Sequence, residues 1–244
     1  ILIIKGEDHL LVDCGTKTPS ALFQLGVPIF EIRNLLITHS HADHVGGLEE
    51  LMLMGRYVAR RKPRIFIPAS FEKDLWNHSL RGGCEWNERH DGKGLGFSDY
   101  FEVSRPKALK RAGREMAEFT LGSINIKTFR TRHFPEQAET WKDAHYSVGM
   151  LIDDRVLFTG DTMFDRELVE GYWDQYRPEV IFHDAQFFTG GIHASLDEIS
   201  AFSPEIKERT YLMHYADSYQ KMKETVGERG FAGFVEQWVY YDFA

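Results

Sequence analysis

The sequence contains little that would place this protein in an oxidising compartment or in a membrane. Only two cysteines, Cys14 and Cys84, occur in 244 residues. A disulfide framework is therefore not expected, which favours a reducing cytoplasm. No apolar run reaches the roughly 18–20 residues that a membrane-spanning helix needs, and no signal peptide is visible. We expect a cytoplasmic protein with no membrane partner.

The chain also lacks an excess of positive charge. Lys and Arg total 29 against 37 Asp and Glu, which gives a formal net charge of −8. Because affinity for nucleic-acid backbones comes mainly from Lys and Arg, stable binding of nucleic acid is not expected. A single phosphate group could still be bound if metal ions supplied positive charge locally.

The composition is that of a globular protein. Hydrophobic residues make up 43% of the chain and charged residues 27%, which allows a substantial core and excludes disorder. Apolar strand-like runs alternate with helical patterns throughout, so we expect an α/β fold and one domain over residues 1–244. The chain opens on Ile1 in the apolar run ILII, and we expect a further N-terminal strand of the fold to precede it.

Residues 81–99 are polar and rich in glycine, and they form the longest predicted loop. Loops of this length are often lids or binding arms. Together with neighbouring Tyr100, they include Trp86, His90 and Phe97, whose rings could stack on a nucleobase. We expect either a lid or dimer arm, or an ordinary surface loop.

Histidine is the residue that points to chemistry. Four potential metal ligands occur within six residues, directly after the apolar run LLIT: His39, His41, Asp43 and His44. The spacing of two between the first two histidines fits an extended segment. So many imidazole and carboxylate groups in so short a stretch favour two adjacent metal ions such as Zn²⁺ or Mn²⁺ over a solvated turn.

This HxHxDH motif, followed by a distant His, Asp and His, resembles the metallo-β-lactamase superfamily, and within it the ribonuclease Z-like phosphodiesterases. The resemblance covers about residues 11–219. It implies a four-layer αβ/βα sandwich, with the metal ions at the edge between two sheets.

The resemblance also implies how seven ligands hold two divalent metal ions, for which we expect zinc, with manganese as the alternative. One ion takes His39, His41 and His133. The other takes Asp43, His44 and His214, and Asp161 bridges the two. A water between the ions would serve as the nucleophile, with Asp43 orienting it or accepting its proton.

Two further motifs resemble those of the ribonuclease Z-like branch. His183-Asp184-Ala185 stands where that branch has His-Glu-Ala, and His193-Ala194-Ser195 stands where it has a second His motif. His193 comes 21 positions before His214, which also matches. The resemblance implies that His193 protonates the leaving oxygen and that an acidic residue orients it. Here that acid would be Asp184, which is one methylene shorter than Glu. The simpler interpretation is a packing His193 beside a Ser195 helix cap.

The chain has no room for the arm with which related enzymes bind transfer RNA, and this favours a smaller substrate. Enzymes of this branch that process transfer RNA carry a long arm between the third His ligand and the bridging Asp, whereas here only 28 positions separate His133 from Asp161. The chain looks most like armless anti-Pycsar-type proteins, which open 3′,5′-cyclic nucleotide monophosphates. We therefore expect a small nucleotide substrate. The resemblance to this branch also implies a homodimer. The alternatives are a tRNA 3′-processing endonuclease, a lactonase or ester hydrolase, and a catalytically silent binding module.

Overall fold

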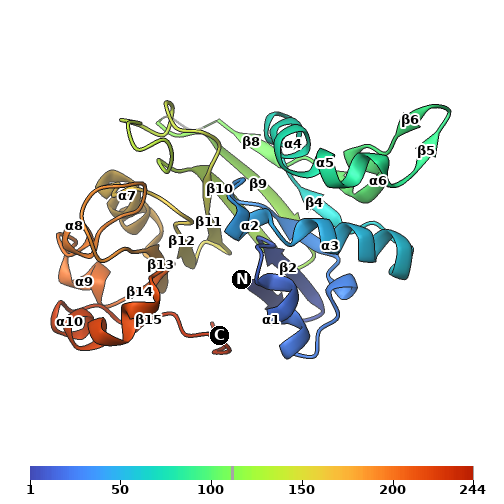
Figure 1. The fold of residues 1–244 in the computed structure, drawn as a ribbon. Coiled ribbons are helices and arrows are strands. Elements are labelled where there is room, and N and C mark those ends of the chain that lie inside the picture. Colours follow the sequence, from blue (N-terminus) through green and yellow to red (C-terminus); the bar gives the residue numbers. More distant parts are fainter. Residues whose placement is uncertain (111–112, 244) are drawn as a thin grey trace. The chain divides into compact units, whose positions relative to one another are not determined.

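The computed structural model describes residues 1–110 and 113–243 (Figure 1). The chain divides into two compact units. The first comprises residues 1–108 and 117–124, and the second comprises residues 109–116 and 125–244. Each unit is mixed α/β, the fold class predicted for the chain as a whole. Within the described residues, no helix combines the length and apolar character needed to cross a bilayer.

The first unit is built on a sheet with strand order β1-β2-β3-β4-β7. Its strands are β1 (Leu2–Lys5), β2 (Asp8–Val12), β3 (Asn34–Leu36), β4 (Arg64–Phe66) and β7 (Glu102–Ser104). The predicted N-terminal hairpin is confirmed, since β1 pairs antiparallel with β2. Strands β2, β3, β4 and β7 are parallel, so their carboxyl ends lie at one edge.

Six helices and a short hairpin complete the first unit. They are α1 (Thr18–Gln24), α2 (Ala42–Val45), α3 (Leu48–Leu53), α4 (Ala69–Leu75), α5 (Arg81–Cys84), α6 (Phe97–Tyr100), β5 (Arg89–His90) and β6 (Lys93–Gly94). The π-helical turns Met54–Ala59 and Trp76–Leu80 extend α3 and α4. Strands β8 (Lys107–Leu109) and β9 (Met116–Leu121) lie where the chain passes between the units.

The second unit contains strands in the order β15-β14-β13-β12-β11-β10. They are β10 (Ile124–Arg130), β11 (Val148–Ile152), β12 (Val156–Phe158), β13 (Val180–Asp184), β14 (Thr210–Met213) and β15 (Gly233–Phe234). The first three pair antiparallel and β12 to β15 pair parallel. Strands β10, β12, β13 and β14 therefore all point their carboxyl ends toward the same edge.

Four helices pack beside this sheet (Figure 1). They are α7 (Arg166–Tyr176), α8 (Leu196–Ile199), α9 (Pro204–Lys207) and α10 (Lys223–Glu228). Their buried residues, such as Val169 and Ile199, join sheet residues such as Leu157 and Leu212 in one core. Burial of this kind stabilises the fold by about 25 cal/mol per Å² of apolar surface.

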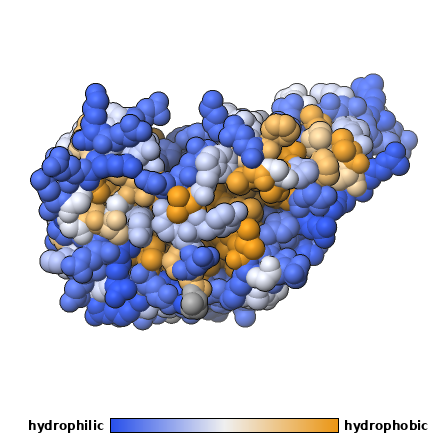
Figure 2. Space-filling model, turned by 90° about the horizontal axis from the view of Figure 1, so that it is seen from below, coloured by the Kyte–Doolittle hydropathy of each residue, from blue (hydrophilic) through white to orange (hydrophobic). Residues whose placement is uncertain are grey.

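Some apolar side chains of the first unit remain in solvent. Ile1, Ile4, Phe23 and Leu25 are exposed. Figure 2, which shows the molecule from below, has apolar residues gathered on this face.

Candidate metal centre

The first unit groups its predicted ligands just past the carboxyl end of β3. The His39 side chain is fully buried, and its Nε2 lies 3.0 Å from Nδ1 of His41. The ring of His44 lies 4.0 Å from that of His39, measured between centroids. The three imidazoles of the HSHADH motif thus converge, as the motif predicts.

Asp13, which the sequence analysis did not single out, orients this cluster. It follows β2, whose carboxyl end lies beside that of β3. Its carboxylate accepts hydrogen bonds from Nδ1 of His44 at 2.7 Å and from the backbone N–H and hydroxyl of Thr38 at 2.7 and 2.8 Å. A bond of this kind fixes the tautomer of a ligating histidine and turns its Nε2 toward the ion.

Asp43 differs from the histidines in its exposure. Its side chain is 58% exposed, and one carboxylate oxygen lies 3.6 Å from Nε2 of His44. Its backbone is tightly held, because a Cβ built on Gly15 would lie 1.6 Å from the carbonyl oxygen of Asp43. Only glycine allows this approach. The carboxylate is thus partly exposed, while the backbone that bears it is fixed.

The second unit groups its predicted ligands around a buried carboxylate. Asp161 is 3% exposed and follows β12 through Gly160, whose φ of +63° favours glycine. One oxygen of Asp161 lies 3.3 Å from Nε2 of His214 and 3.8 Å from Nε2 of His133. Since β10, β12 and β14 end at one edge, three residues far apart in sequence meet there.

The other ring nitrogen of His133 is also engaged. Its Nδ1 donates a hydrogen bond to the carbonyl oxygen of Ile192 at 2.8 Å. The bond fixes the tautomer with Nε2 facing Asp161. His133 is fully buried, so the orientation of its ring is determined by packing as well.

Asp184 and His193 form a hydrogen-bonded pair beside these ligands. Nδ1 of His193 lies 2.7 Å from the Asp184 carboxylate, so the shorter side chain of Asp reaches its partner. The backbone N–H of Thr162 donates to the same oxygen at 2.9 Å. Complete burial raises the pKa of Asp184, and the hydrogen bond from His193 opposes that rise.

The ring of His193 lies among the predicted ligands. Its centroid is 4.7 Å from that of His214 and 4.9 Å from that of His133. Two groups of three in the second unit have potential ligand atoms within 4.8 Å of one another: His133, Asp161 and His193, and Asp184, His193 and His214. Imidazole nitrogens and carboxylate oxygens gathered in this way fit a divalent metal ion.

Residues 81–99 are more structured than predicted. They contain α5, the 3₁₀ turn Glu85–Asn87, strands β5 and β6 and the start of α6, where a loop was expected. Tyr100 is 1% exposed and its hydroxyl donates to the carbonyl oxygen of Cys84, so this ring belongs to the core. Trp86 and His90 remain exposed, and the role of the segment as lid or arm stays a prediction.

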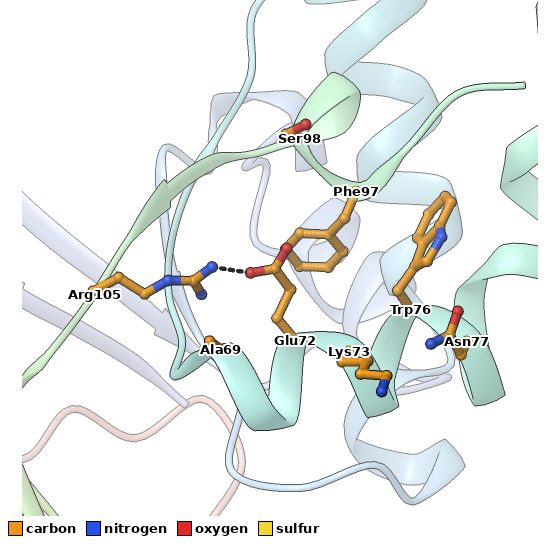
Figure 3. A pocket seen from close by; sticks show the side chains of 8 residues that line it. All are labelled: Ala69, Glu72, Lys73, Trp76, Asn77, Phe97, Ser98 and Arg105. Carbon is orange, nitrogen blue, oxygen red and sulfur yellow. Dashed lines mark hydrogen bonds and ion pairs between the residues drawn. The ribbon is translucent and has the colours of Figure 1, made fainter. Parts of the chain in front are cut away.

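Phe97 lines an open pocket of about 400 Å³ in the first unit. Figure 3 shows its ring and that of Trp76 facing the same space, next to an ion pair between Arg105 and Glu72. None of the predicted metal ligands lines this pocket.

The family of the chain is decided by comparison with known proteins. The family model described as anti-Pycsar protein Apyc1 matches residues 1–241. The chain belongs to this family. It is similar to an anti-Pycsar protein Apyc1 of Bacillus phage BSP38, with 38% identity over 92% of this chain and 84% of the relative. The Apyc1 protein of Paenibacillus xerothermodurans is 34% identical over 96% of this chain and 86% of its own length.

The fold is confirmed by a solved structure. The metallo-β-lactamase fold protein YhfI from Bacillus subtilis matches with a TM-score of 0.60 and 17% identity, over 96% of this chain and 85% of that one. This chain therefore has the metallo-β-lactamase fold that the resemblance of its HxHxDH motif implied. Its clustered His and Asp side chains are those of metal-dependent hydrolases.

Proposed function

We propose that this protein is a metal-dependent phosphodiesterase that opens 3′,5′-cyclic nucleotide monophosphates to linear nucleoside monophosphates. Two divalent ions, zinc first among the candidates, would be held by the seven predicted ligands, four in the first unit and three in the second. When bound, such ions supply an activated water and positive charge for the phosphoryl oxygens.

The main support for the proposal is the hydrogen-bonded pair of His193 and Asp184, which lies beside the other histidines of the second unit. A ribose alkoxide is a poor leaving group, so its expulsion from phosphorus benefits from a general acid. When water attacks phosphorus and one P–O bond to the ribose breaks, His193 donates a proton to the leaving oxygen. Asp184 accepts a hydrogen bond from Nδ1 and so presents Nε2 to that oxygen.

A small substrate is favoured by the short interval between His133 and Asp161. It contains β11, β12 and their connections, with no additional helix or strand. The acidic net charge of −8 points the same way, because a long polyanion would be repelled. The resemblance to anti-Pycsar-type proteins singles out cyclic nucleotides among small phosphodiesters. A homodimer remains a prediction.

A turnover screen tests the proposal. Cyclic nucleotides, bis-p-nitrophenyl phosphate, precursor tRNA and an acyl-homoserine lactone would each be offered with Zn²⁺ or Mn²⁺, with and without chelator. We expect metal-dependent opening of cyclic nucleotides. Absence of that reaction, or hydrolysis of the lactone alone, would contradict the proposal.

The variant His193→Ala separates phosphodiester from lactone chemistry. It should lower kcat for a cyclic nucleotide by about 10²–10⁴-fold. The loss should be much smaller for bis-p-nitrophenyl phosphate, because p-nitrophenolate leaves without a proton. The exposed His78, changed to Ala, is the matched control. An equal loss of kcat for both substrates would contradict the proposed role of His193 as a general acid.

A further inference from the structure

The loop before His193, residues 187–192, is closed at its base by the backbone. The N–H of Gln186 donates to the carbonyl oxygen of Ala194 at 2.8 Å, and the N–H of Leu196 donates to that of Gln186 at 2.8 Å. The two ends of the loop are therefore held together, and His193 directly follows the loop, next to the Ala194 carbonyl that closes it.

The side chain of Gln186 fills this loop from within. It is 8% exposed, and its Nε2 donates to the carbonyl oxygens of Phe188, at 2.9 Å, and Gly190. Gly190 and Gly191 both have φ of +89°, a conformation that other residues rarely adopt. The amide of Gln186 thus provides hydrogen bonds to two backbone carbonyls of the turn.

The outer side of the loop is tied to the segment that contains His133. The N–H of Gly191 donates to Oε1 of Glu136 at 2.9 Å. The next carbonyl, that of Ile192, accepts the hydrogen bond from Nδ1 of His133. Two adjacent bonds therefore join residues 133–136 to residues 191–192.

We propose that Gln186 and Glu136 are positioning residues for this site. By fixing the loop they hold the Ile192 carbonyl against His133 and hold His193 against Asp184. The effect on His133 requires only that it binds a metal ion, whereas the effect on His193 rests on the proposed function. If either anchor is lost, the Ile192 carbonyl is no longer held in place, and Nδ1 of His133 loses a fixed hydrogen-bond acceptor.

Metal affinity is the first readout, measured by competition with a chromophoric chelator. Gln186→Met keeps the volume of the side chain and removes the amide. We expect it to weaken binding about 10–100-fold, the usual effect of losing a partner of a metal-ligating histidine. Gln220→Met, at an exposed glutamine of the same unit, is the control.

Glu136 allows a test that leaves the core intact, because its side chain is exposed. Glu136→Ala should weaken metal binding about tenfold. Glu136→Gln keeps an oxygen that can accept from Gly191 and should restore most of the affinity. Glu139→Ala, at another exposed glutamate of this segment, controls for the loss of negative charge.

The second readout is the ratio of kcat values for a cyclic nucleotide and bis-p-nitrophenyl phosphate at saturating metal. If His193 is displaced, Gln186→Met should lower this ratio at least about tenfold, within the range expected for weakened general-acid catalysis. Wild-type metal affinity in both Gln186→Met and Glu136→Ala would overturn the proposal. The proposal would also be overturned if Glu136→Gln lost as much metal affinity as Glu136→Ala. If Gln186→Met fails to fold, the metal affinities of the two Glu136 variants test the proposal. Failure of all turnover would refute the proposed function and leave the metal-affinity result standing.

Discussion

At the scale of single residues, the roles of the histidines depend on their second ring nitrogen. His44 and His133 each engage that nitrogen with an oxygen, from Asp13 and Ile192 respectively. The motif predicts which residues could be ligands. It does not show which nitrogen of each ring is available to a metal ion. The signal for Asp13 is its place directly after an apolar strand, but its contact with His44 spans 31 positions.

His183 lies in the His183-Asp184-Ala185 motif, but its side chain packs in the core. It is fully buried, and its Nδ1 donates to the carbonyl oxygen of Asp184 at 2.7 Å. Among the described residues, Nε2 has no hydrogen-bond partner. Burial therefore lowers the pKa of the His183 imidazole from 6.5 to about 4.

This lowered pKa predicts a pH-dependent loss of stability. Well above pH 6.5, His183 is neutral in the folded and in the unfolded protein. Between pH 6.5 and about 4, His183 binds a proton in the unfolded protein but stays neutral in the folded protein. The free energy of unfolding should fall by at most about 3 kcal/mol more in the wild type than in His183→Asn as the pH falls toward 4. Urea unfolding between pH 4 and 7.5 measures the difference. Other groups, Asp184 among them, titrate in both proteins, so parallel curves would contradict the prediction.

At the scale of elements, parallel strands bring the site residues together. In the second unit β12 leads to Asp161, β13 ends at Asp184 and β14 leads to His214. Neighbouring parallel strands end at the same edge, so residues that follow them become neighbours in space. The sequence predicts each of these strands from its apolar run, but their order in the sheet depends on how the strands pair.

Gly15 links two elements of the first unit, the turn after β2 and helix α2. Gly15→Ala should destabilise the fold by more than about 3 kcal/mol, because a Cβ would overlap the backbone oxygen of Asp43. Gly82→Ala, in α5 with nothing within 4 Å of the added Cβ, should stabilise the protein by up to about 1 kcal/mol. Thermal unfolding of both variants checks this pair, and similar Tm values for the two would show that the approach to Asp43 is not tight.

At the scale of the whole molecule, the proposed ligands are divided between two compact units, and each unit has buried apolar residues of its own. Metal ions bound only by the folded chain add to its stability. At a free metal concentration 100 times Kd, each site adds about 2.7 kcal/mol.

Removal of metal should therefore lower both stability and activity. We expect chelator to lower Tm by several degrees, and added Zn²⁺ or Mn²⁺ to restore it. Asp161→Asn should abolish most of this metal-dependent gain, because Asp161 is the buried carboxylate among the proposed ligands and a neutral amide would bind a divalent cation more weakly. A Tm that does not respond to chelator or to added metal would contradict the assignment of the site.

The α/β class, the family resemblance and the chemical nature of the predicted ligands follow from the amino-acid sequence alone. These depend on residue type and on short-range spacing, as in HSHADH. Only the folded chain shows which distant groups hold them in place: Asp13 for His44, Ile192 for His133, and Gln186 and Glu136 for the loop before His193. It also showed that the 81–99 segment is folded and that Tyr100 is buried. Such pairings depend on strand order, loop conformation and packing, and local periodicity contains no information about contacts between residues far apart in the chain.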